Sequence, residues 1–319
     1  MRDPIISVVI PTYNRARFLP AAVASVRAQS YQCDEILIVD DGSGDDTAEV
    51  VAALGPGVRL IRQANAGPAA ARNRGIHEAR GDLIAFLDTD DRWLPGKLAA
   101  QVELFGREPE LGLVCADMAI ENDAGVQFVE SNFVLRGLQQ DFSALDGRPI
   151  PDAQRRLLEV NFVNTSTVVA NRQLLLTLGG FDTRLRYGED LELWLRIAAR
   201  RPIACVASVQ EVRVEHDSNV TRSIEPMLQG YVQMAEAIRE WAGGAMADWD
   251  IDANRYVANC MADLGYWYFS NGRMADARKA MAASFREAPN SRSALYFAGS
   301  LLPGTLRRFV RRLKERAAA

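Results

Sequence analysis

The first part of the chain, as far as about residue 220, alternates short apolar runs with segments of helical spacing, and this alternation limits the fold more than any other feature. The apolar runs cover residues 5–10, 35–39, 58–61 and 83–87, and the helical segments cover 16–30, 47–54, 67–79 and 94–105. Further strands are predicted at 111–118, 165–170 and 202–214, further helices at 172–178 and 189–200, and loops between 121 and 151. Such alternation is typical of an α/β protein whose mostly parallel sheet is flanked by helices.

After about residue 224 the pattern becomes helical without strands. A set of small, aromatic and turn residues has the spacing of a tetratricopeptide hairpin, namely Leu264, Gly265, Tyr268, Gly272, Ala277 and Pro289. One such repeat cannot bury its own apolar face, so we expect it to pack on the first domain or on a partner. The sequence therefore predicts an α/β domain at 1–223 and an all-helical region at 224–319.

The segment 306–316 has the pattern of a basic amphipathic helix. Its apolar face holds Leu306, Phe309, Val310 and Leu313, and its other face holds Arg307, Arg308, Arg311, Arg312, Lys314 and Arg316 against the single acid Glu315. A helix of this kind suits an anionic membrane surface and predicts peripheral membrane contact. The alternative is a solvated helix that caps the core.

Composition excludes several classes of protein. With 48% hydrophobic and 24% charged residues, the 319-residue chain fits a soluble globular protein. A net charge of −4 argues against a nucleic-acid partner. Four scattered cysteines indicate buried thiols in a reducing compartment, with neither a disulfide framework nor a zinc site. Because the chain shows no signal peptide and no apolar window near the length of about 18 residues that spans a bilayer, we expect a cytoplasmic protein, at the inner face of the membrane if the basic segment binds there.

An acidic cluster follows the apolar run 83–86. It holds Asp88, Thr89, Asp90 and Asp91, at the point where a buried strand is predicted to end. Carboxylates crowded in this way repel one another, and a divalent cation that carries a phosphate-bearing substrate compensates them, because Mg²⁺ and Mn²⁺ favour one or two carboxylates plus substrate phosphates. An acidic turn or helix cap is the alternative.

Two other strand ends carry polar motifs. Pro11 ends the first apolar run and is followed by Thr12, Tyr13, Asn14 and Arg15, where an aromatic ring and a hydroxyl can receive a base and a ribose. In open α/β sheets ligands bind beyond the carboxyl ends of the strands, which is where these motifs fall. A proline-stopped strand that leads into a helix is the plainer interpretation.

The second strand ends in the motif 40–43, whose Asp41 is an acceptor that suits the imino N–H of a uracil. Helix capping alone would also explain this motif. The segment 65–75 joins small residues such as Gly67 to Arg72, which can pair with a diphosphate bidentately. An Ala-rich helix with exposed arginines is the alternative there.

The segment 187–196 opens a predicted helix with Glu189 and Asp190 behind Gly188. A carboxylate at this place can point into a cleft, and Asp190 could then remove a proton from an incoming hydroxyl, a role worth about 10²–10⁴-fold in rate. A helix N-terminus that carries acids is a common alternative.

Taken together, these motifs resemble a known family. The motifs 7–15, 39–43, 65–73, 88–91, 179–182 and 189–190 match, in order and spacing, the family 2 inverting glycosyltransferases of the GT-A fold, over roughly residues 5–220. The resemblance implies a nucleotide-sugar donor, Mn²⁺ or Mg²⁺ as cofactor, and a single displacement that inverts the anomeric carbon.

The resemblance also implies roles for individual residues. The base and ribose would be lined by Pro11, Thr12 and Tyr13, with Asp41 on the base edge, and Arg72 would lie near the diphosphate. Asp88 or Asp90 would reach the ribose, Asp90 or Asp91 would bind the metal, and Asp190 would be the catalytic base. The donor-binding set is completed by Arg15, Gly67 and Thr89. His216 lies where related enzymes place a residue near the metal, and a neutral imidazole can ligate Mn²⁺. A structural histidine is the alternative for His216.

The resulting hypothesis is a metal-dependent hexosyltransferase of the inverting type that uses a UDP-sugar, the nucleotide that Asp41 favours. The basic segment 306–316 hints at a glycan or lipid-linked acceptor, as in surface polysaccharide or glycolipid assembly. A sugar-1-phosphate nucleotidyltransferase is disfavoured, because residues 11–14 replace the Gly-rich phosphate loop of that class. An inactive sugar-nucleotide-binding scaffold with a helical partner-binding tail is the remaining alternative.

Overall fold

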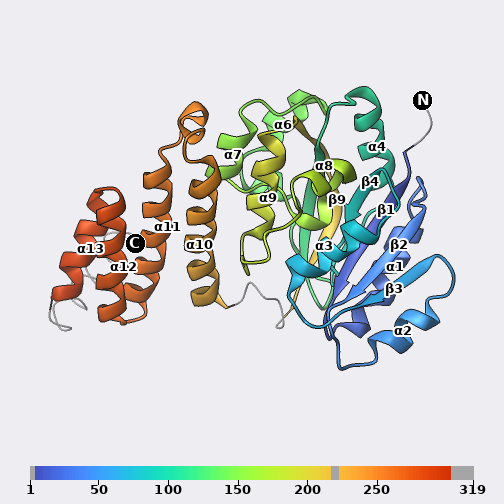
Figure 1. Ribbon diagram of the computed structural model, residues 1–319, viewed down its shortest axis with the longest axis horizontal. Coiled ribbons are helices and arrows are strands. Elements are labelled where there is room, and N and C mark those ends of the chain that lie inside the picture. The colour runs from blue at the N-terminus through green and yellow to red at the C-terminus, as the bar shows by residue number, and fades with distance from the viewer. Residues whose placement is uncertain (1–3, 217–222, 303–319) are drawn as a thin grey trace. The chain divides into compact units, whose positions relative to one another are not determined.

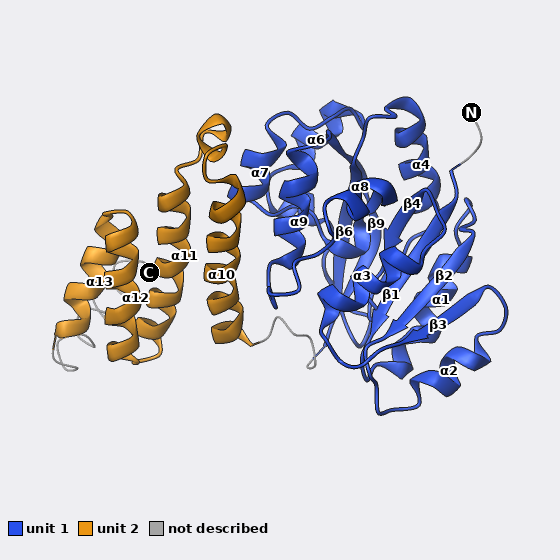
Figure 2. Ribbon diagram, viewed as in Figure 1, with its two compact units in different colours: residues 1–219 blue, residues 220–319 orange. Residues whose placement is uncertain are grey.

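The computed structural model describes residues 4–216 and 223–302 and divides the chain into two compact units, residues 1–219 and 220–319 (Figure 2). The predicted boundary after residue 223 lies close to this division, and the roles of the two domains stay predictions. Each unit is described by itself.

Unit 1 is built on one mixed sheet with the strand order β3-β2-β1-β4-β8-β6-β9-β5, and β7 pairs with β6 (Figure 1). The strands are β1 (Ile6–Thr12), β2 (Glu35–Asp40), β3 (Val58–Arg62), β4 (Leu83–Phe86), β5 (Arg92–Trp93), β6 (Leu113–Asn122), β7 (Gln127–Val129), β8 (Val169–Asn171) and β9 (Ile203–Glu215). Neighbours among β1–β4 run parallel, as do β6 and β9, whereas β8, β5 and β7 pair antiparallel. The predicted α/β class with a mostly parallel sheet is confirmed.

The helices of unit 1 are α1 (Leu19–Arg27), α2 (Thr47–Ala53), α3 (Pro68–Glu78), α4 (Lys97–Arg107), α5 (Asn132–Leu135), α6 (Gln139–Leu145), α7 (Ala153–Glu159), α8 (Arg172–Thr177) and α9 (Glu189–Ala198). Both faces of β1 are covered. Ile6, Val8 and Ile10 join α1 in one buried cluster, while Val9 faces α3. A Cβ on Gly75 of α3 would lie 2.3 Å from Val9 Cγ1, so this glycine lets helix and strand approach closely.

Some local predictions were wrong. β1 continues through Pro11 to Thr12, which pairs with Asp40, because the strand has a partner on β2 beyond the proline. The predicted strand at 165–170 is a 3-10 turn, Thr165–Thr167, followed by the short β8, because the Asn164 side chain accepts a hydrogen bond from Ser166 N and caps the turn. The stretch read as loops holds the end of β6, then β7, α5 and α6.

Unit 2 holds α10 (Ile224–Ala242), α11 (Ala253–Ser270), α12 (Met274–Glu287) and α13 (Ser291–Leu301), with a 3-10 turn at Met246–Trp249. Gly272 turns α11 into α12 with φ 77°, and a Cβ on Gly265 of α11 would lie 3.0 Å from Met281 of α12. These small residues therefore lie where a tightly packed helical hairpin needs them. The relation to a tetratricopeptide repeat stays a prediction, and the basic segment 306–316 lies outside the described residues.

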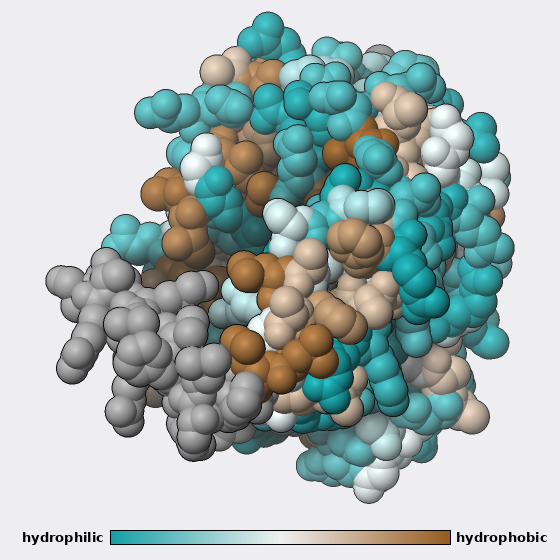
Figure 3. Space-filling view, turned by 90° about the vertical axis from the view of Figure 1, so that its left-hand side faces the viewer, coloured by the Kyte–Doolittle hydropathy of each residue, from teal (hydrophilic) through white to brown (hydrophobic). Residues whose placement is uncertain are grey.

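Several large apolar side chains of unit 2 are exposed, among them Phe285, Leu295 and Leu301. Figure 3, which faces this end of the chain, shows hydrophobic residues in patches between polar ones. Within residues 4–216 and 223–302, no helix has both the length and the apolar character to cross a membrane.

Candidate active site

The predicted site residues gather at the carboxyl ends of β1, β2, β4 and β9 in unit 1. The loop after β4 lies beside the end of β1 because these strands are parallel neighbours. Leu87 N donates to Val9 O (3.1 Å), and Thr89 Oγ1 donates to Pro11 O (2.5 Å). Two predicted segments separated by more than seventy residues are thereby fixed to one another.

The predicted base-binding residues offer one buried hydroxyl and one exposed ring. Thr12 is buried, and its Oγ1 has no hydrogen-bond partner among the residues described. Tyr13 is 48% exposed, so its ring is free to meet a planar ligand. A buried hydroxyl without a partner is costly, and a ligand oxygen or nitrogen that reached Thr12 would remove that cost.

Asp41 holds the turn that precedes α3. Its carboxylate accepts hydrogen bonds from Gln63 Nε2 (2.8 Å), Ala66 N (2.9 Å) and Gly67 N (2.8 Å). A carboxylate offers about four acceptor positions, so these bonds leave room for one more donor. The predicted role of Asp41 on a base edge stays a prediction, while its structural role is visible.

Arg72 joins the two acidic motifs. From α3 its Nη2 donates to Asp88 Oδ1 (2.8 Å) and its Nη1 to Glu189 Oε1 (3.0 Å). The guanidinium is buried, and the neighbouring charges of Asp88 and Glu189 raise its pKa further against the opposing effect of burial. Arg72 therefore fixes the acidic loop after β4 to the start of α9.

The start of α9 is also held by the glycine-rich turn before it. Asn73 of α3 donates to Phe181 O (2.8 Å) and accepts from Phe181 N (2.7 Å). Gly180 has φ 72°, and a Cβ there would lie 2.2 Å from Asn73 Oδ1. These hydrogen bonds between the motifs around residues 73 and 180 thus hold the turn that precedes Glu189 and Asp190.

Burial changes the titration of these two acids. Burial raises the pKa of Glu189 to about 7, with the adjacent charge of Asp190 adding to the effect. Burial also raises the pKa of Asp190, against the opposing hydrogen bond from Leu191 N. A carboxylate with a raised pKa is a stronger base, which fits the predicted role of Asp190. The motif predicted the base role for Asp190 and no role for Glu189, which in the structure pairs with Arg72.

The three acids of the cluster face different ways. Asp91 points inward, where its Oδ2 accepts from Ser166 Oγ (2.7 Å) and its Oδ1 from Val214 N (3.3 Å). Burial raises its pKa to about 7, and the charges of Asp90 and Asp88 add to the effect. Asp91 therefore makes structural contacts, and the metal roles predicted for Asp90, Asp91 and His216 stay predictions.

Asp90 meets His216 and Arg15. His216 Nε2 lies 3.0 Å from Asp90 Oδ2, and Arg15 Nη1 lies 3.1 Å from each of these two atoms. The His216 ring stacks on Phe18 at a centroid distance of 4.9 Å. The structure thus brings together residues from three distant segments that the sequence had placed in one site.

These donors fit a divalent cation that also binds a ligand's phosphates. In the described part of the chain, no three His, Cys, Asp or Glu side chains form a group that could hold a metal by themselves. Asp90 and His216 supply one carboxylate oxygen and one imidazole nitrogen, and Mn²⁺ and Mg²⁺ commonly complete such a set with water and substrate phosphates.

Two buried charged residues beneath the site escaped sequence analysis. Lys97 and Glu211 are both fully buried, and Lys97 Nζ donates to Gln101 Oε1 (2.7 Å) and lies 4.2 Å from the centroid of the Trp93 ring. Burial lowers the pKa of Lys97 to about 7 and, with the charge of Asp91, raises the pKa of Glu211 well above its ordinary value. Both sit in ordinary helix and strand patterns, so no sequence signal marked them.

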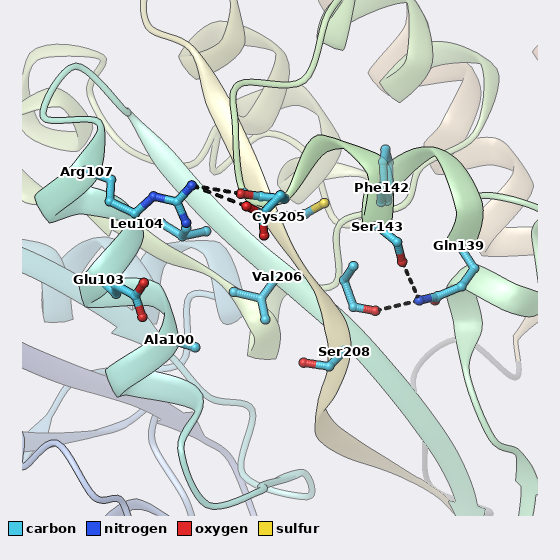
Figure 4. A pocket seen from close by; sticks show the side chains of 13 residues that line it. Ala100, Glu103, Leu104, Arg107, Gln139, Phe142, Ser143, Cys205, Val206 and Ser208 are labelled. Carbon is cyan, nitrogen blue, oxygen red and sulfur yellow. Dashed lines mark hydrogen bonds and ion pairs between the residues drawn. The ribbon is translucent and has the colours of Figure 1, made fainter.

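A separate hollow of about 440 Å³ lies between α4, α6 and the beginning of β9 (Figure 4). Arg107 reaches across it to Asp146, and Gln139 donates to Ser143 and to the carbonyl of Ala207. None of the predicted site residues lines this hollow. It lies at the beginning of β9, whereas His216 follows the end of that strand.

A mixed sheet of this order, with carboxylates, arginines and a histidine at the carboxyl ends of its strands, has the architecture of a GT-A-like α/β protein. Residues 7–166 match the model of the family described as "Glycosyl transferase family 2". The chain belongs to glycosyl transferase family 2, and the resemblance stated from its motifs is confirmed.

Comparison with known proteins is consistent with this family assignment. The chain is 33% identical to an uncharacterized glycosyltransferase of Rickettsia conorii over 222 residues, which are 69% of this chain but only 34% of that protein. Among solved structures, S. aureus TarS 1-349 in complex with UDP matches with a TM-score of 0.62 at 17% identity, over 96% of this chain and 86% of that one. The complex of the same protein with UDP-GlcNAc matches with a TM-score of 0.64 at 17% identity, over 91% and 83%. At this identity the structural likeness concerns the fold.

Proposed function

We propose that the chain is an inverting glycosyltransferase that moves a hexosyl group from a UDP-sugar to an acceptor hydroxyl with the help of Mn²⁺ or Mg²⁺. The observation that carries the proposal is the convergence of Asp88, Asp90, His216, Arg72 and Asp190 at one edge of the sheet of a family 2 member. UDP is the proposed nucleotide because TarS, which shares the fold, is described in complex with UDP and UDP-GlcNAc.

The donor would lie along the carboxyl edge of β1, β2 and β4. The base would meet the exposed ring of Tyr13 and the buried hydroxyl of Thr12. Asp88 or Asp90 would reach the ribose. Asp90 and His216 would hold the metal, which supplies positive charge to the diphosphate when bound. Arg72 keeps Asp88 in place through their 2.8 Å ion pair.

Asp190 would act as the general base. Its raised pKa lets it take the proton of the acceptor hydroxyl as the oxygen attacks the anomeric carbon from the face opposite the nucleotide. Glu189, bonded to Arg72, holds the N-terminus of α9 so that Asp190 keeps its direction. A single displacement of this kind inverts the anomeric carbon. A glycan or lipid-linked acceptor, as in surface polysaccharide or glycolipid assembly, is the proposed class, and the basic segment 306–316 supports it.

Calorimetric titration of UDP into the full chain, with and without Mn²⁺, tests the proposal. We expect Mn²⁺-dependent binding that Asp90→Ala removes, followed by transfer or slow hydrolysis when UDP-sugars are screened. Absence of binding by UDP, GDP and dTDP in the presence of either metal would refute the donor site. Binding without transfer or hydrolysis of any UDP-sugar would instead favour the inactive scaffold.

A further inference from the structure

A cationic side chain of the protein lies at the pair of donors that the proposed function assigns to the metal. Arg15 Nη1 is 3.1 Å from Asp90 Oδ2 and 3.1 Å from His216 Nε2, and these two atoms lie within hydrogen-bond distance of each other, at 3.0 Å. The three side chains come from the turn after β1, the loop after β4 and the end of β9. They meet at one point from three sides.

The hydrogen-bonding chemistry of Arg15, Asp90 and His216 indicates which kind of ligand this position favours. A guanidinium only donates and a carboxylate only accepts, so His216 Nε2 can accept from Arg15 in one tautomer or donate to Asp90 Oδ2 in the other. The tautomer that accepts from Arg15 is also the one whose Nε2 lone pair can bind a metal ion. One imidazole nitrogen and one carboxylate oxygen at one position form a donor pair that can hold a divalent cation such as Mn²⁺.

The acceptors are held more firmly than the cation. The His216 side chain is 1% exposed and stacks on Phe18, and Asp90 belongs to a loop fastened to β1 through Thr89. Arg15 and Asp90 are similarly exposed, at 18% and 15%, but Arg15 carries its guanidinium on a longer side chain that can turn without a change in the backbone. A metal ion bonded to Asp90 and His216 at about 2.1 Å would occupy the place of Arg15 Nη1 and repel its charge.

We propose that Arg15 is a built-in competitor of the metal: it occupies the cation position in the donor-free protein and must leave that position when Mn²⁺ or Mg²⁺ binds. The inference rests on the proposed function, because it takes Asp90 and His216 as the metal ligands. The donor diphosphate would offer the displaced guanidinium an anionic partner. Arg15 thereby makes the metal bind weakly to the free protein and well together with the donor.

The test measures Mn²⁺ affinity directly, by the loss of the free-ion signal in electron paramagnetic resonance, with and without saturating UDP. Arg15→Gln removes the charge and keeps the length of the side chain, and Arg27→Gln is the matched control, because Arg27 donates to Pro56 O at the other end of α1. We expect Arg15→Gln to bind Mn²⁺ about tenfold more tightly than the wild type without UDP, equivalent to about 1.4 kcal/mol. The gain in Mn²⁺ affinity on adding UDP should shrink accordingly, and Arg27→Gln should match the wild type.

Three outcomes decide between the possibilities. The inference is overturned if the Mn²⁺ dissociation constant of Arg15→Gln without UDP stays within about twofold of the wild type, or rises. In that case, Mn²⁺ binding in the presence of UDP would still support the proposed function. Addition of His216→Ala to Arg15→Gln should abolish the gained affinity, and a gain that survives would place the metal elsewhere and overturn the inference as well. Failure of the wild type to bind Mn²⁺ even with UDP would refute the proposed function, and the inference with it. Unchanged circular dichroism spectra and melting temperatures exclude misfolding of the variants.

Discussion

Replacement of Lys97 by Met offers a direct test of the electrostatics beneath the site. Lys97 is fully buried, and burial lowers its pKa from the ordinary 10.5 to about 7. Between these two values the unfolded chain binds one proton more than the folded protein, so stability rises with pH there. The slope is about 1.4 kcal/mol per pH unit, and over the whole interval the change is on the order of 5 kcal/mol.

The cost of the buried charge differs between the two ends of this pH interval. Below pH 7 lysine is protonated in both states, so the folded protein bears the full cost of a buried charge. Above pH 10.5 lysine is neutral in both states and the cost is gone. The free energy of unfolding of the wild type minus that of Lys97→Met should therefore rise from about pH 7 toward pH 10.5. Loss of the hydrogen bond to Gln101 Oε1 adds a cost of about 1–3 kcal/mol that does not depend on pH.

Urea unfolding at several pH values, followed by tryptophan fluorescence, measures this difference, with the buried Trp93 and Trp194 reporting on unit 1. Lys279→Met is the control, because Lys279 is exposed on α12. A difference between wild type and Lys97→Met that stays constant between pH 7 and 10, or falls, would refute the reasoning that burial keeps Lys97 neutral.

Three further changes test other parts of unit 1. Asp190→Asn should keep UDP and Mn²⁺ binding while transfer falls by about 10²–10⁴-fold, because the general base is lost; full transfer activity would remove Asp190 from that role. Ser166→Ala should lower the free energy of unfolding by about 1–3 kcal/mol, because the buried Asp91 loses a hydrogen bond, and an unchanged urea midpoint would contradict this. Gly75→Ala should lower the free energy of unfolding by about 1–3 kcal/mol, because its Cβ would overlap a side chain of β1. Gly106→Ala in α4 is the control, because its Cβ meets open space and the change should be neutral or stabilising. Equal melting temperatures for the two variants would contradict this prediction.

Sequence reasoning predicted the fold where one physical signal dominated. Buried strands such as β1, β2 and β4 are continuous apolar runs, and the helices between them have clear spacing, so their order and approximate bounds followed. The end of β1 was wrongly predicted at Pro11, because proline usually ends a strand, whereas here the strand continues beside β2. The α5 and α6 helices were missed because both are short, and because α6 opens with the polar residues Gln139, Gln140 and Asp141, which resemble a loop.

The motifs of the site could be predicted from the sequence, but the different contacts of the residues within each motif could not. Asp88, Asp90 and Asp91 are chemically identical, and only the turn of the loop decides which of them faces Ser166. Similarly, the pairing of Arg72 with Glu189 joins residues more than a hundred positions apart. Spacing along the chain contains no information about such contacts, because tertiary packing creates them.

The outward acids of the cluster are already matched by charge within the protein. Asp88 pairs with Arg72 at 2.8 Å and Asp90 with Arg15 at 3.1 Å, while Asp91 is buried against Ser166. Under the proposed function, a metal that bound at Asp90 would replace the existing attraction to Arg15, so its net gain in free energy without a donor would be small. The donor diphosphate would then offer an anionic partner to the displaced Arg15. Each ligand would thus favour the binding of the other, and linkage requires that the factor by which UDP raises Mn²⁺ affinity equals the factor by which Mn²⁺ raises UDP affinity.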